Sequence, residues 1–129
     1  MNRVTLRALT LVAAFALAAG PAIAGGDPVK GKKVFAKCKV CHSLKKGKNK
    51  VGPSLYGVFG RTAGTGAGFK RYSPAMKKSG VVWSAETLDK YLAKPKGFIK
   101  GNRMSFGGLK KKADRDNIIS YLEQATKPK

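Results

Sequence analysis

The chain has 129 residues, with 27 Lys and Arg against 6 Asp and Glu and a single His, for a formal charge of +21 at pH 7. This length is typical of one domain, and two cysteines exclude a fold built on a disulfide framework. One histidine argues against a His-rich metal centre, while the positive charge indicates an anionic partner: nucleic acid, acidic lipid or an acidic protein surface.

Residues 1–24 have the three parts of a secretory signal peptide: a start with two arginines, an apolar run of eleven residues and a small-residue cleavage site ending at Ala24. The apolar run is too short for a membrane anchor, which needs about 20 residues. We therefore expect a cleaved signal peptide and a single mature domain, 25–129, that is soluble in the periplasm and has no stable membrane anchor. Cleavage removes two Arg and no acid, so 25 basic and 6 acidic residues remain.

Two helices are predicted in the first half of the mature domain. Asp27-Pro28 places an N-cap before a proline at the first helical position. Three residues then follow at helical spacing: Val34, Phe35 and Cys38. Ser73-Pro74 repeats the signature, and Gly80 is a typical C-terminal stop for a helix of about two turns.

Two further helices are predicted in the second half. Ser84 can cap a helix that Pro95 ends, because the residue before a proline disfavours helical dihedral angles. The inner face of this helix would be Leu88, Tyr91 and Leu92. The last helix begins near Asp114 and Asp116, acids that suit a helix N-terminus. Its buried stripe would be Ile118, Tyr121, Leu122 and Ala125. No convincing alternation of period two appears, so the predicted class is all-α, with four to five short helices.

Two glycine-rich stretches, 43–72 and 96–112, separate these helices and show no periodicity. Loops of this length are uncommon in a compact domain unless they enclose something. They also contain six aromatic side chains that need apolar surface to pack against. A large flat cofactor would supply that surface.

The segment 38–42 reads C-x-x-C-H, with Cys38, Cys41 and His42, which is the attachment signature of a c-type heme. Two thiols three positions apart at a helix end face the same way, so each can form a thioether with one vinyl group of the porphyrin. His42 then offers an imidazole nitrogen to the iron. The alternatives explain less: a structural zinc site needs four ligands, a thioredoxin-like C-x-x-C follows a strand, and a disulfide leaves His42 unexplained.

The sixth position on the iron falls to Met, Lys or a vacancy for small ligands, because the chain has no second histidine. Met104 lies in a loop that is free to present its sulfur, whereas Met76 lies on the predicted helix after Ser73, where packing is the usual role. We therefore predict His42 and Met104 as the axial ligands, a pair that raises the reduction potential and suits electron transfer. An open sixth position would instead indicate a heme enzyme or a ligand-binding protein.

Nearly all of 25–129 resembles a class I cytochrome c of the mitochondrial-like small bacterial type. The resemblance rests on the heme motif and on these further residues: Gly52 to Gly57, Phe59-Gly60-Arg61, Gly68-Phe69, Tyr72, Val82-Trp83, Leu88 to Leu92 and the loop around Met104. It implies the cytochrome c fold, in which short helices and long loops enclose one covalently attached heme c. The first and last helices would cross, and Gly31, Phe35 and Tyr121 match that contact.

The resemblance also implies roles for residues around the heme. The Pro53 carbonyl would accept the second imidazole N–H of His42 and so orient the ring. Tyr72 and Trp83 would hydrogen-bond one heme propionate, with Arg61 nearby as its charge partner.

Tyr91 would lie close to the Met104 sulfur, and Phe106 would cover the exposed heme edge. Three positions depart from the pattern of the family, which commonly has a proline, a threonine and a polar residue there: Lys100, Asn102 and Met76. The first two of these lie in the loop that carries Met104.

We therefore predict a monomeric single-electron carrier, not an enzyme. Cations around the heme motif and the Met104 loop would steer it to acidic surfaces of redox proteins; they are Lys37, Lys39, Lys96, Lys100, Arg103, Lys110, Lys111 and Lys112. By resemblance, the partners would be a cytochrome bc complex and a terminal oxidase, a photosynthetic reaction centre or a periplasmic dehydrogenase. We expect no nucleic-acid binding, because an exported heme protein has little use for it.

Overall fold

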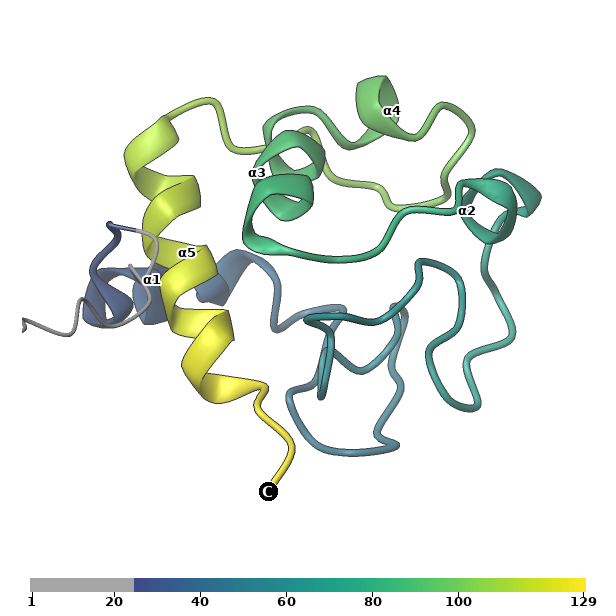
Figure 1. Ribbon diagram of the computed structural model, residues 1–129, viewed down its shortest axis with the longest axis horizontal. Helices are drawn as coiled ribbons and strands as arrows, with labels where there is room; N and C mark the ends of the chain where they lie inside the picture. The colour runs from purple at the N-terminus through teal and green to yellow at the C-terminus, as the bar shows by residue number, and fades with distance from the viewer. Residues whose placement is uncertain (1–24) are drawn as a thin grey trace, which may run out of the picture.

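The computed structural model describes residues 25–129, so the predicted signal peptide lies outside the described residues. Five α-helices and one 3-10 helix follow one another in this part of the chain (Figure 1): α1 (Pro28–Val34), η1 (Phe35–Lys37), α2 (Pro74–Lys78), α3 (Ala85–Ala93), α4 (Pro95–Phe98) and α5 (Lys112–Ala125). Within 25–129, the β pairing consists of one isolated antiparallel bridge between Thr62 and Val82. The all-α prediction is confirmed.

The residues predicted to start three of the helices do so through their side chains. Asp27 Oδ1 accepts a hydrogen bond of 2.8 Å from a backbone N–H in the first turn of α1. Ser73 Oγ accepts one of 3.0 Å from Met76 N at the start of α2. Ser84 and Thr87 bond each other's backbone N–H groups, a capping box that begins α3. These local interactions explain why the sequence placed the starts correctly.

The short helix α4 was not predicted. Pro95 ends α3, as expected, but it is also the first residue of α4, because its fixed φ angle suits the first helical position. Lys94, between the two helices, has φ −156° and ψ 86° and so breaks the helical path.

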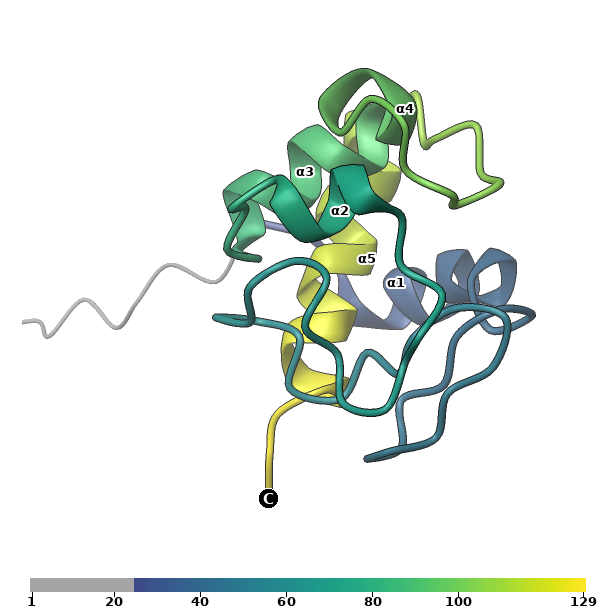
Figure 2. The ribbon, with the colours of Figure 1, turned by 90° about the vertical axis from the view of Figure 1, so that its right-hand side faces the viewer.

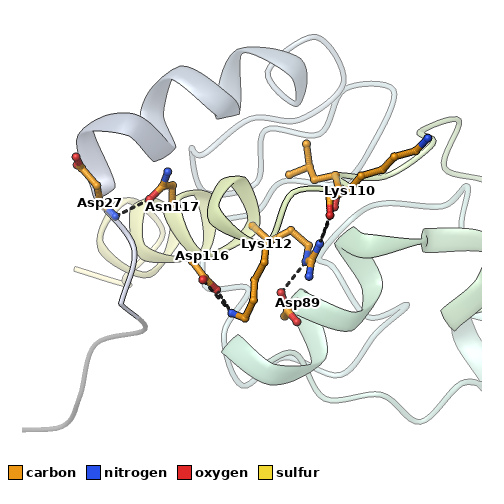
Figure 3. Close-up of polar contacts among 8 residues, drawn as sticks. Asp27, Asp89, Lys110, Lys112, Asp116 and Asn117 are labelled. Atoms are coloured by element: carbon orange, nitrogen blue, oxygen red, sulfur yellow. Dashed lines mark hydrogen bonds and ion pairs between the residues drawn. The ribbon is translucent and has the colours of Figure 1, made fainter.

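α1 and α5 cross at close range (Figure 1). A Cβ atom on Gly31 would lie 1.9 Å from the carbonyl oxygen of Asn117, so this approach requires glycine. Beside the crossing, the rings of Phe35 and Tyr121 have centroids 5.6 Å apart, and Asp27 N donates to Asn117 Oδ1 at 2.8 Å (Figure 3). The crossing implied by the family resemblance is present.

α5 is buried over a wider arc than its sequence pattern indicated. Ile118 and Leu122 are buried as predicted, but Ile119 and Ser120 are also only 1 % exposed, whereas Tyr121 is half-buried. The reason is that α5 packs against α1 and also against α3, so two faces of the helix are covered. In the described part of the chain, no helix has the length and apolar character needed to cross a membrane.

Candidate heme site

A cavity of about 390 Å³ lies between the helices and the long loops. Its lining contains every side chain that the sequence assigned to the heme or its iron: Cys38, Cys41, His42, Pro53, Arg61, Tyr72, Trp83, Tyr91 and Met104. Apolar side chains from α3 and α5, among them Leu88, Leu92 and Ile118, form much of the remaining wall. In Figure 2 the green loop after α4 lies above the blue segment that follows α1.

The C-x-x-C-H segment leaves η1 as a hydrogen-bonded turn. Cys41 N and His42 N both donate to Cys38 O, at 3.0 and 2.9 Å, which brings all three side chains to one cavity wall. No disulfide joins the two cysteines. Burial raises the pKa of the Cys38 thiol to about 11, although the nearby Lys37 acts in the opposite direction. The thiol of Cys38 is therefore protonated at neutral pH.

His42 is held so that one ring nitrogen remains free. Its Nδ1 lies 2.7 Å from the carbonyl oxygen of Pro53, and because a carbonyl can only accept, Nδ1 carries the proton. Burial lowers the pKa of His42, the bond to Pro53 opposes this, and the charges of Arg61 and Lys50 lower it further. The imidazole is thus neutral at pH 7 and its Nε2 retains a lone pair for a metal.

Gly52 is a site residue whose role the sequence did not reveal. A Cβ atom there would lie 2.4 Å from Cε1 of His42 and less than 3.0 Å from both ring nitrogens. The backbone of Gly52 therefore forms a wall against which the imidazole ring rests. The Gly-Pro pair at 52–53 was visible in the sequence, but its proximity to His42 depends on the fold of the loop.

Met104 enters the cavity from the loop between α4 and α5. Its sulfur accepts a hydrogen bond from the hydroxyl of Tyr91, with an O–S distance of 3.6 Å, and Tyr91 itself is 6 % exposed. Burial raises the pKa of Tyr91 to about 12, with a further contribution from Tyr72, so the hydroxyl stays a donor at neutral pH. Met76 also lines the cavity, from α2. Both methionines therefore reach the cavity where an axial ligand is needed.

Arg61, Tyr72 and Trp83 bring polar groups to the cavity wall. The Arg61 guanidinium donates to the carbonyl oxygens of Ser54 and Tyr56, at 3.0 and 3.2 Å, and burial lowers its pKa. The Tyr72 hydroxyl accepts from Gly66 N at 3.1 Å, which leaves its own proton free to be donated. A cation, a hydroxyl and an indole N–H are groups that bind carboxylates.

These side chains fit a covalently held heme. The apolar walls suit a porphyrin, the two thiols suit thioether attachment, and an imidazole and a thioether are typical axial ligands of heme iron. The polar groups of Arg61, Tyr72 and Trp83 suit the propionates. No cluster of three or more His, Cys, Asp or Glu side chains that could hold a bare metal ion occurs in residues 25–129.

The cations predicted to dock partners differ in their surroundings. All eight are exposed, and Lys37 and Arg103 line the cavity, as does Arg71, which the sequence analysis did not single out. Lys112 differs from the expected free cation, because its Nζ pairs with Asp116 Oδ1 at 2.6 Å (Figure 3). The remaining five, Lys39, Lys96, Lys100, Lys110 and Lys111, do not line the cavity.

An all-α fold around a cavity with these donors defines a protein that encloses a heme, and comparison with known proteins agrees. The profile of the family described as Cytochrome c matches residues 28–126. Cytochrome c2 iso-2 of Magnetospirillum fulvum is 58% identical over 89 residues, which cover 69% of this chain and 92% of that protein. Cytochrome c of Cochliobolus lunatus is 49% identical over 104 residues, or 79% of this chain and 95% of that protein.

Among solved structures, cytochrome cH from Methylobacterium extorquens superposes with a TM-score of 0.71 at 44% sequence identity, covering 77% of this chain and 99% of that one. The chain therefore belongs to the class I cytochrome c family, as the sequence resemblance predicted. It is an electron carrier with one covalent heme c, and it is not an enzyme.

Proposed function

We propose that the chain is a periplasmic single-electron carrier in which Cys38 and Cys41 attach the heme and His42 and Met104 are the axial ligands of its iron. The observation that carries this proposal is the meeting of these four side chains, from segments far apart in the sequence, at one cavity. When bound, the heme supplies a one-electron couple, the ferrous and ferric states of its iron.

The protein's own residues would keep both axial ligands in place when the iron changes its charge. Pro53 holds the imidazole of His42 in one tautomer and orientation. Tyr91 donates to the sulfur of Met104 from a buried position. Apolar side chains around them exclude water, which favours the less charged ferrous state and raises the reduction potential. Since little has to rearrange, this arrangement suits electron transfer rather than the activation of a small ligand.

The distribution of charge supports docking to acidic partners at the cavity. All six acids lie on the cap of α1, on α3 or on α5: Asp27, Glu86, Asp89, Asp114, Asp116 and Glu123. None of them lines the cavity, whereas Lys37, Arg61, Arg71 and Arg103 do. The cavity lining therefore carries four cationic side chains and no acidic one. Their field would orient the protein on an acidic surface and raise the rate of encounter.

The proposed location and partners follow from the sequence and from this distribution of charge. The signal-peptide pattern of residues 1–24 favours export to the periplasm, with a mature domain of 25–129 acting as a monomer in a respiratory or photosynthetic chain. The partners would be a bc-type complex and a terminal oxidase, a reaction centre or a periplasmic dehydrogenase. Each would have to present an acidic surface to the cations that line the cavity.

The far-red absorption band of ferric, methionine-ligated heme tests the proposed ligands. Met104→Ala is expected to abolish this band and to lower the reduction potential by a large margin, because loss of the thioether removes the ligand that raises it. Met76→Ala is the matched control, since it removes the other methionine of the same cavity, and it is expected to keep the band. The reverse result would assign the ligand to Met76. A high-spin wild type without the band would refute methionine ligation and indicate an open sixth position.

A further inference from the structure

The buried asparagine in the loop before Met104 bonds only backbone groups through its side-chain amide. Asn102 is 4 % exposed, and three hydrogen bonds of 2.9 Å use its amide. Its Nδ2 donates to the carbonyl oxygens of Pro95 and Ile99, and its Oδ1 accepts from the backbone N–H of Met104. All three partners are backbone groups, so the side chain acts on the path of the chain.

The amide has only one orientation that satisfies these partners. If it were turned over, Oδ1 would face two carbonyl oxygens and Nδ2 would face an N–H group, and all three contacts would be repulsive. Aspartate would place a carboxylate against the carbonyls of Pro95 and Ile99, so it does not replace asparagine here. The site therefore requires a side chain with donors on one side and an acceptor on the other.

The three bonds join the beginning and end of α4 to the residue that we propose as the axial ligand. Pro95 is the first residue of α4 and Ile99 is its C-cap, and α4 in turn packs on α3. α3 carries Tyr91, whose hydroxyl contacts the Met104 sulfur. Asn102 thus holds the backbone of Met104 on α4, which packs on α3, the helix that contacts the Met104 sulfur. Lys100, two residues before Asn102, is exposed.

We propose that Asn102 is the positioning residue that keeps Met104 on the heme iron, by pinning the Met104 backbone to both ends of α4. This inference rests on the proposed His42 and Met104 ligation. Without the side chain of Asn102, the carbonyl of Pro95 still accepts from Ile99 N and the carbonyl of Ile99 still accepts from the backbone N–H of residue 102, but the Met104 N–H loses its acceptor. Loss of the Asn102 side chain therefore frees the backbone of the loop at Met104, the proposed ligand.

Competition by imidazole measures this release directly. Added imidazole binds the ferric iron only in molecules whose methionine has left, so its apparent affinity is proportional to the population of that state. Titration of the ferric holoprotein, followed by the loss of the far-red band, is expected to show about a tenfold lower apparent Kd for Asn102→Ala than for the wild type. A tenfold change corresponds to about 1.4 kcal/mol, the scale of one buried hydrogen bond.

A matched control separates this local role from general stability. Asn117 also bonds a backbone group, Asp27 N, but at the crossing of α1 and α5. Asn117→Ala is expected to lower the denaturant midpoint while its apparent Kd for imidazole stays within about twofold of the wild type. Asn102→Ser replaces the amide, with its acceptor and two donors, by one shorter hydroxyl that can still accept. It is therefore expected to fall between Asn102→Ala and the wild type, and it decides the matter if Asn102→Ala does not accumulate with heme.

The outcomes distinguish this inference from the function on which it rests. A wild type without the far-red band would refute methionine ligation and the inference with it. A wild type with the band, but with wild-type imidazole affinity in the Asn102 variants, would overturn the role of Asn102 alone. An equal shift in Asn117→Ala would also overturn it, because the effect would then report general loosening of the fold.

Discussion

Replacing Gly31 by alanine tests whether the close crossing of α1 and α5 holds the fold together. The new Cβ would lie 1.9 Å from Asn117 O, 2.6 Å from Asn117 C and 2.7 Å from Tyr121 Cβ, whereas Cβ atoms essentially never come within 3.0 Å of other heavy atoms. Two of these three atoms are backbone, so no change of rotamer relieves the clash. The two helices must therefore separate by about 1 Å.

The cost of this separation follows from three terms. Overpacking in a tightly packed interface costs up to about 3 kcal/mol. The hydrogen bond from Asp27 N to Asn117 Oδ1 spans the same crossing, and its loss costs about 1 kcal/mol. Alanine is better than glycine inside a helix by about 1 kcal/mol, which partly compensates. We expect Gly31→Ala to lower the free energy of unfolding by about 3 kcal/mol.

Guanidinium chloride unfolding of the holoprotein measures this loss as a lower midpoint with an unchanged slope. The control is Gly107→Ala, because a Cβ at Gly107 would meet no atom within 4 Å, and its free energy of unfolding should stay within about 0.5 kcal/mol of the wild type. A Gly31→Ala variant as stable as Gly107→Ala would show that the crossing adapts, and would refute the reasoning.

Two further predictions concern charge. Arg115, whose side chain is 12% exposed, donates from Nε to Asp89 Oδ1 at 2.7 Å and from Nη1 to two carbonyls before α5. Arg115→Ala should therefore cost about 2 to 3 kcal/mol in thermal or denaturant unfolding. Lys37→Glu, which reverses a charge at the cavity, should slow electron transfer with an acidic redox partner by roughly three- to tenfold at low salt, as stopped-flow kinetics would measure.

One residue serves as the control for both. Lys112 pairs with Asp116, but its side chain is 69% exposed. Lys112→Ala should therefore change the free energy of unfolding by less than about 1 kcal/mol. Equal losses of stability in Lys112→Ala and Arg115→Ala would contradict the importance of burial. Lys112 also does not line the cavity, so Lys112→Glu should slow the reaction less than Lys37→Glu does. A rate for Lys37→Glu that does not depend on ionic strength would argue against steering by the cavity side.

Much of the site was predictable because the residues that carry its chemistry are adjacent in the sequence. The spacing of Cys38, Cys41 and His42 predicted a heme before any fold was known, and the starts of α1, α2 and α3 followed from their caps. The buried arc of α5 was predicted only in part, because the periodicity of one helix does not reveal that it packs against both α1 and α3. α4 was missed because Pro95 can end one helix and begin the next.

Local features can be read from the residues alone: the family, the heme motif, the helix caps and the overall excess of positive charge. Features that depend on contacts between distant segments follow from how the whole chain packs. This packing placed Tyr91 against the Met104 sulfur, Gly52 against the His42 ring, and Asn102 between Met104 and both ends of α4. It also sorted the charges, pairing Lys112 with Asp116 and leaving the cavity wall without an acid. The physical reason is that short-range patterns report the conformation and faces of one segment, whereas the partner of each face is chosen by packing of the whole chain.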